Sequence, residues 1–184
     1  LSAAVSLLLS QVRDSTVGTM LEINKLIYRT RCDKSHVLKV HGDLRVRDLL
    51  VAGWSDASPL NRPDGKSTQG ISIGITHQSL LSGEMCKVSP FWRSAKLERQ
   101  CRPPGASEAL AAINCVDALF GVKLQVFEMP GHSVNVRKTE ESVAQVPAVL
   151  VTDSTNVHDR ITTRRMARKR RQQFASQTLL HTEA

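Results

Sequence analysis

Aromatic residues and long apolar runs are both scarce in this chain of 184 residues. Phe, Trp and Tyr together make up 4% of it, so its core has to be built from aliphatic side chains, for which a hydrophobic content of 41% is enough. No apolar run approaches the roughly 18 residues that a membrane span requires. The leucine-rich start lacks the basic flank and the cleavage site of a signal peptide. We therefore expect no membrane partner.

The four cysteines also lack the spacing of a functional set. They form no CxxC pair, and no histidines stand at zinc-finger spacing from them; the four are Cys32, Cys86, Cys101 and Cys115. This pattern argues against a structural zinc site and against a disulfide framework, and it is typical of a reducing compartment. We expect an intracellular protein, cytoplasmic or nuclear.

The positive charge of the chain is confined to one segment. The net charge is +8, and Arg160 to Arg171 holds seven Lys and Arg residues and no acid. The remaining 18 basic residues are balanced by 17 acidic ones, so the rest of the chain is nearly neutral. The basic run favours non-specific attraction to phosphate, or sequence that has decayed beyond the folded domain; a nuclear-import signal is a third interpretation.

The length fits one domain with appendages. The chain begins with Leu1 and has no methionine before Met20, which suggests a fragment of a longer protein or a mispredicted start. We divide it into a helical connection segment over residues 1–35, an incomplete mixed α/β domain over 36–160, and a basic C-terminal tail over 161–184.

Hydrophobic periodicity predicts the elements of these parts. Residues 1–31 have helical spacing, with a break and a cap at Asp14 to Thr16. The later pattern predicts, in chain order, a strand and turn over 36–43, a core strand ending at 58, a strand over 70–76, a strand over 90–96, a helix over 106–127 that could break at Gly121, a polar connection over 130–145, a strand over 146–154, a helix from 155, and no further strand.

Three acidic residues occupy related places in this pattern. Asp56 and Asp153 each follow an apolar run, and Glu108 lies at the start of the long helix. A strand that follows a crossover helix should lie parallel to an earlier strand. We therefore expect Asp56 and Asp153 side by side at neighbouring strand ends, with Glu108 brought over them. Crowded carboxylates repel one another, whereas hard divalent cations prefer oxygen ligands, so the trio predicts a metal site.

Five short segments, in this order, resemble the RNase H region of copia-type retrotransposon polyproteins. They are Trp54-Ser55-Asp56-Ala57, Lys66-Ser67-Thr68-Gln69-Gly70, Trp92-Arg93-Ser94-Ala95-Lys96, Ser107-Glu108-Ala109 and Val151-Thr152-Asp153-Ser154. The helical lead-in is similar to the connection that joins the reverse transcriptase to that domain. The resemblance covers roughly residues 15–160.

The resemblance implies a fold, an activity and partners. The fold would be RNase H-like: a three-stranded meander followed by a helix, a parallel strand and a helix. The activity would be cleavage of the RNA strand of an RNA/DNA hybrid with two Mg²⁺ ions, or Mn²⁺, held by Asp56, Glu108 and Asp153. The partners would be that hybrid and an upstream reverse transcriptase domain. The family supplies a fourth acid from a later helix, and neither Asp159 nor Glu183 matches that position.

Several polar side chains are candidates for contacts to nucleic acid. Hydroxyls beside strand ends can bind phosphates or 2′-hydroxyls, and cations can follow phosphates, although local hydrogen bonds and solvated surface charge are the more common roles. These candidates are Ser55, Ser58, Thr152, Arg62, Lys66 and Arg93. His158 could assist proton transfer, or could be an ordinary helix-surface histidine.

Two other functions remain open from the sequence. The chain could be a non-catalytic remnant that binds nucleic acid, which the lack of a fourth acid near Asp56 and Asp153 would favour. It could also be a structural connection module for an upstream polymerase, which predicts an apolar docking surface on residues 1–31.

Overall fold

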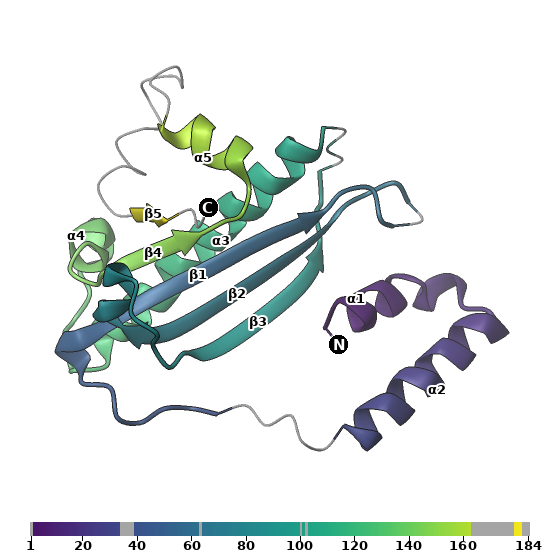
Figure 1. Ribbon diagram of the computed structural model, residues 1–184, viewed down its shortest axis with the longest axis horizontal. Coiled ribbons are helices and arrows are strands. Elements are labelled where there is room, and N and C mark those ends of the chain that lie inside the picture. Colours follow the sequence, from purple (N-terminus) through teal and green to yellow (C-terminus); the bar gives the residue numbers. More distant parts are fainter. Residues whose placement is uncertain are drawn as a thin grey trace.

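One mixed sheet forms the centre of the protein (Figure 1). The computed structural model describes residues 2–33, 39–62, 64–99, 101, 103–162 and 179–181. Five strands lie in the order β3-β2-β1-β4-β5. Their bounds are Leu49–Ser58 for β1, Thr68–His77 for β2, Ser89–Lys96 for β3, Ala148–Val151 for β4 and Leu179–His181 for β5.

The sheet topology confirms the predicted fold class. Strands β1, β2 and β3 form an antiparallel meander, and β4 returns parallel to β1 after a long helix. The turn between β1 and β2 closes with hydrogen bonds between Arg62 and Gly65 and between Arg62 and Lys66. Gly65 has a φ of 68°, a left-handed conformation that glycine adopts at little cost.

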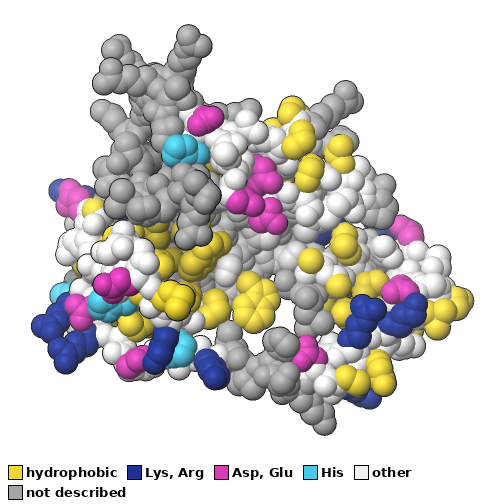
Figure 2. Space-filling view, viewed as in Figure 1, with side chains coloured by type: hydrophobic (Ala, Val, Ile, Leu, Met, Phe, Trp, Pro, Cys, Tyr) yellow, Lys and Arg dark blue, Asp and Glu magenta, His cyan; other side chains and the backbone are white. Residues whose placement is uncertain are grey.

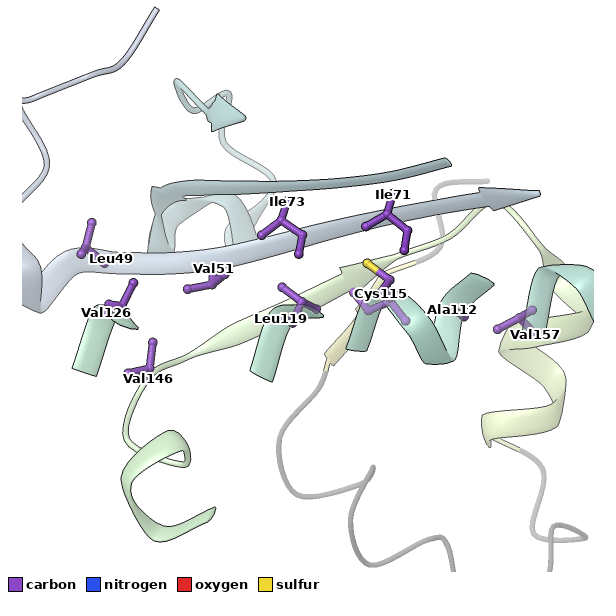
Figure 3. Close-up of a cluster of buried hydrophobic side chains, with 11 residues drawn as sticks. Leu49, Val51, Ile71, Ile73, Ala112, Cys115, Leu119, Val126, Val146 and Val157 are labelled. Carbon is purple, nitrogen blue, oxygen red and sulfur yellow. The ribbon is translucent and has the colours of Figure 1, made fainter. Parts of the chain in front are cut away.

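Helix α3, Pro104–Glu128, covers one face of β1 and β2. By length and composition alone it could cross a membrane, but one side of it packs on the sheet. Its stripe of buried apolar residues meets Val51 and Ile73, as Figure 3 shows. The Asn114 Nδ2 donates to Gln69 Oε1 at 2.7 Å, which fixes α3 against β2. A side chain at Gly121 would face open space, and helix α3 continues through this residue without a break.

The contact between α3 and β1 depends on Gly53. A Cβ atom at this position would lie 2.9 Å from Cys115 Sγ and 2.9 Å from Leu119 Cδ1. These distances are shorter than those real Cβ atoms show, so a side chain at position 53 would require Cys115, Leu119 or the helix itself to shift. The glycine therefore allows α3 to pack closely on β1 at Cys115 and Leu119.

The opposite face of the sheet carries a smaller apolar cluster. Leu50, Ala52 and Val149 are buried there, and Leu80 and Leu81 pack against them. The two leucines belong to the 3₁₀ helix η3, Gln78–Ser82. Because alternate residues of a strand face opposite sides, β1 contributes Val51 and Gly53 to one face and Leu50 and Ala52 to the other.

Residues 2–33 form two helices, as predicted. Helix α1 is Ser2–Ser10 and α2 is Val17–Cys32, with the short 3₁₀ helix η1, Val12–Asp14, between them. Thr16 caps α2 by accepting a hydrogen bond from the backbone N–H of Thr19, whose hydroxyl in turn accepts from the backbone N–H of Thr16. Helix α1 lies against β3 (Figure 1).

The remaining elements are short. They are η2 at Val46–Asp48, η4 at Val136–Lys138, α4 at Thr139–Val143 and α5 at Thr155–Thr162.

Four predictions about these segments need correction. Residues 39–45 form no strand, because no neighbouring strand pairs with them; residues 36–38 lie outside the described part. Residues 130–145 contain η4 and α4, since Val143 is fully buried and holds a helical turn there. The strand predicted over 146–154 is limited to β4, with which β1 pairs only as far as Val151.

The fourth correction concerns the segment assigned to the basic tail. Residues 179–181 form β5, parallel to β4, where no strand was predicted. A three-residue strand is too short to show a periodicity, and it forms because β4 presents an unpaired edge. Arg160 and the residues to Thr162 belong to α5, while residues 163–171 of the basic run lie outside the described residues.

Gly53→Ala should destabilise the fold by about 1–3 kcal/mol, because the new methyl group forces α3 away from β1. Gly121→Ala is the matched control, since its methyl group meets nothing and alanine favours a helix by up to about 1 kcal/mol. Urea unfolding measures both changes. Equal effects of the two substitutions would contradict the close approach at Gly53.

Candidate active site

The register between β1 and β4 brings two acids together. Trp54 pairs with Val151 in this parallel register. Asp56 and Asp153 each lie two residues further along their chains, so they leave the sheet side by side. Both side chains are exposed. Figure 2 shows acidic side chains gathered where β1 and β4 end. The predicted neighbourhood of the two aspartates is therefore present.

Glu108 approaches the same place from the second turn of α3. Burial raises the pKa of its carboxyl, and the charges of Asp56 and Asp153 raise it further. A hydrogen bond from the backbone of Ala57, on β1 next to Asp56, lowers the pKa and only partly offsets these effects. Both aspartates act on Glu108 because all three carboxylates lie at one end of the sheet. The structure thus brings the two aspartates within electrostatic reach of Glu108.

The two aspartates line an open cleft of about 600 Å³ on the face of the sheet opposite α3. Its floor holds small residues of β2 and β3, namely Gly70, Ser72 and Ser94. One wall comes from α1 through Ala3, and in Figure 2 the surface is hollowed between the sheet and the N-terminal helices. A chain of nucleotides has room to approach the acids from this side.

Two polar atoms of the site are buried without a hydrogen-bond partner, Glu108 Oε2 and Ser55 Oγ. Unpaired buried polar atoms are costly, so they mark places where a ligand or a water completes the bonding. A carboxylate oxygen that lacks a donor, beside two further carboxylates, fits a hard divalent cation in ligand type. Within the described residues, however, no three His, Cys, Asp or Glu side chains are arranged to hold one ion.

The predicted nucleic-acid contacts differ in their surroundings. Ser58 and Arg93 are exposed and line the cleft, and Lys66 is half-buried in the turn between β1 and β2. Arg62 is only 5% exposed. Its Nε donates to Thr68 Oγ1 at 3.0 Å and its guanidinium also donates to Ser6 Oγ at 2.6 Å. In this structure Arg62 ties α1 to the first hairpin, and a phosphate would have to displace Ser6 to reach it.

The remaining candidates are held by local contacts. Thr152 is buried, and its Oγ1 accepts a hydrogen bond from the backbone N–H of Ser154 at 3.2 Å. His158 lies on α5, with its Nδ1 3.6 Å from Asp159 Oδ1. These contacts favour local roles for both. Glu183 lies outside the described residues.

Sequence reasoning assigned no contact role to Trp54 or Trp92, yet both line the cleft. They are the two tryptophans of the chain. Each stands in a strand pattern, which indicates a core residue as readily as a surface one. The pairing of both with Ser72 on the middle strand is what places them on one face.

The sequence matches no protein-family model and no curated protein. Two solved structures are similar to this chain. LC9-RNase H1, a type 1 RNase H with the type 2 active-site motif, is 18% identical over 66% of this chain and 46% of its own, with a TM-score of 0.29. A foamy viral protease-reverse transcriptase in complex with RNA/DNA hybrid is 12% identical over 91% of this chain and 24% of its own, with a TM-score of 0.36.

The chain therefore spans less than half of either structure. At these identities and TM-scores the likeness carries nothing about residues or activity. The assignment of the fold class rests on the strand order and directions of the chain itself.

Glu108→Gln should make the protein more stable at pH 7. The ordinary pKa of the carboxyl, 4.5, is raised in the folded state, so ionisation favours the unfolded chain as pH rises through and above that value. Below about pH 4 both states are protonated, and the advantage of the variant should vanish. Thermal unfolding from pH 3.5 to 8 measures this, with the exposed Glu98→Gln as control. If the extra stability of Glu108→Gln did not change with pH, the raised pKa of Glu108 would be contradicted.

Arg62→Ala should lower the free energy of unfolding by about 1–3 kcal/mol, because it removes hydrogen bonds from a buried charged group. Lys66→Ala should change it by less than about 0.5 kcal/mol, as is usual at a surface. Urea unfolding compares the two. If Arg62→Ala left stability unchanged while weakening hybrid binding more than Lys66→Ala, the original interpretation of Arg62 as a phosphate contact would be restored.

Proposed function

We propose that this chain is an RNase H-like nuclease domain that hydrolyses the RNA strand of RNA/DNA hybrids. The observation that carries the proposal is that Asp56 on β1 and Asp153, two residues after β4, line one open cleft, and that the charges of both raise the pKa of Glu108 on α3. Nothing in the packing of the core requires three carboxylates there, and their mutual repulsion costs stability. A site that binds cations accounts for that cost.

The donor set determines how the site would work. Asp56 and Asp153, both exposed, would bind Mg²⁺ or Mn²⁺, and Glu108 would add the unpaired Oε2. Two such ions activate a water and stabilise the charge on the leaving oxygen of a phosphodiester. The N–H of Ala57 holds Glu108 toward β1. Lys66 and Arg93 would attract the phosphates of the substrate.

The proposed origin of the domain is a copia-type retrotransposon polyprotein. The five sequence segments support this origin, and three of them supply the three acids. The proposed partners are an RNA/DNA hybrid and an upstream reverse transcriptase domain, in an intracellular setting. The N-terminal helices α1 and α2 would be the connection to that domain; Met20, Leu21 and Tyr28 on α2 are exposed, as a docking surface requires.

One observation favours a second candidate function. Among the described residues, no three ligand side chains are arranged for a single ion. A domain that kept the fold and the cleft but no longer assembled the metal site would bind nucleic acid without cutting it.

The test is cleavage of a hybrid with labelled RNA in the presence of Mg²⁺. Asp56→Asn should lower the rate by at least about 100-fold, because an amide is a poorer ligand for a hard cation than a carboxylate. Asp153→Asn should act similarly. Asp117→Asn, an exposed acid on α3 outside the cleft, should leave the rate unchanged.

Cutting by the parent, lost in the two site variants, supports the nuclease. A folded parent that retains the hybrid without cutting it would instead establish the second candidate. A parent that neither cuts nor retains the hybrid would contradict both.

A further inference from the structure

The cleft beside the acids has two indole walls and a floor of small residues. Trp54 on β1 and Trp92 on β3 both pair with Ser72 on β2, so the three side chains leave the same face of the sheet. The next row along the strands is Asp56, Gly70 and Ser94. All of these residues line the one cleft. Two large flat side chains therefore stand on either side of a trough that leads to the acids.

The spacing of the strands sets how far apart the two indoles begin. Neighbouring strands lie about 4.8 Å apart, so the backbones of Trp54 and Trp92 are separated by about 10 Å. Trp54 leans across β2: a Cβ on Gly74 would lie 3.5 Å from its Cζ3. Trp92, on the outer strand, is 54% exposed. An exposed indole beside Ser72 in its own row and Gly70 in the next row has an open face on which another ring can stack.

The polar groups of the trough indicate which kind of ring would bind there. Serine hydroxyls on the floor offer hydrogen bonds, and Asp56 closes the end. Phe91, the other exposed aromatic of β3, points to the opposite face, so the apolar surface does not continue around the edge. A large continuous apolar patch would point to a protein partner, and the cleft mixes its two indoles with hydroxyls and an acid instead. A nucleobase, flat and apolar on its faces and polar at its edges, matches an indole wall with hydroxyls below it.

We propose that the cleft between Trp54 and Trp92 binds an unpaired nucleobase next to the acid cluster. In a paired duplex the faces of the bases are covered by their neighbours, so stacking on Trp92 requires a base that is free of its partner. Resting on the proposed function, this makes the preferred substrate a hybrid that ends in a single-stranded overhang, with the first unpaired base in the cleft and the adjoining phosphate at the acids.

The experiment measures binding, so it does not depend on cleavage. Fluorescence anisotropy of labelled nucleic acid with the Asp56→Asn chain compares a blunt RNA/DNA hybrid with the same hybrid carrying a single-stranded overhang. We expect the overhang to bind about tenfold or more tightly, as one stacked base provides. Trp92→Ala should remove this preference and leave the affinity for the blunt hybrid unchanged, whereas Trp92→Phe should keep most of it. Phe91→Ala, 50% exposed on the other face, should have no effect.

Three results would overturn the proposal. One is equal affinity of the Asp56→Asn chain for blunt and overhanging hybrids. Another is an equal loss in Trp92→Ala and Phe91→Ala, which would show a general role of the β3 edge. The third is an equal loss for both hybrids in Trp92→Ala, which would mean that the indole contacts the backbone. If the nuclease fails but the overhang preference and its loss in Trp92→Ala are found, the base-binding cleft stands without the catalytic function.

Discussion

The close packing of α3 on β1 over Gly53 is the constraint on which the site depends. Cys115 and Leu119 occupy the space that any side chain at position 53 would need. The same helix carries Glu108, whose carboxyl accepts a hydrogen bond from the backbone of Ala57 and feels the charges of Asp56 and Asp153. Gly53 thus permits the close packing of the helix that carries Glu108.

The two faces of the sheet differ in composition: one packs against α3 and the other forms the cleft. The face under α3 holds the larger apolar cluster and provides most of the burial (Figure 3). The other face is apolar only where η3 covers it, and its outer half is a cleft with hydroxyls, indoles and acids. Alternation along β1 supplies both faces from consecutive residues. For this reason Asp56 opens on the cleft while its neighbours Ser55 and Ala57 are buried.

Helix α1 connects the N-terminal segment to the site. Through Ser6 it binds Arg62 of the first hairpin, and through Ala3 it walls the cleft. Arg62 shows why the charge of a residue does not reveal its role: the guanidinium carries the charge expected of a phosphate contact, yet its donors are used inside the protein. Lys66, four residues later, has the same charge and a partly open position in the same turn.

The sequence by itself determined the order of strands β1 to β4 and of helix α3, and which of these elements precede or carry the three acids, because apolar periodicity and a crossover helix leave few arrangements for a parallel strand. Tertiary structure decided what depends on neighbours through space. Arg62 is buried because α1 folds back over it, β5 exists because β4 has a free edge, and Trp54 and Trp92 share a cleft because both pair with Ser72. None of these contacts leaves a periodic trace along the chain, since each is made between segments that the local pattern describes separately.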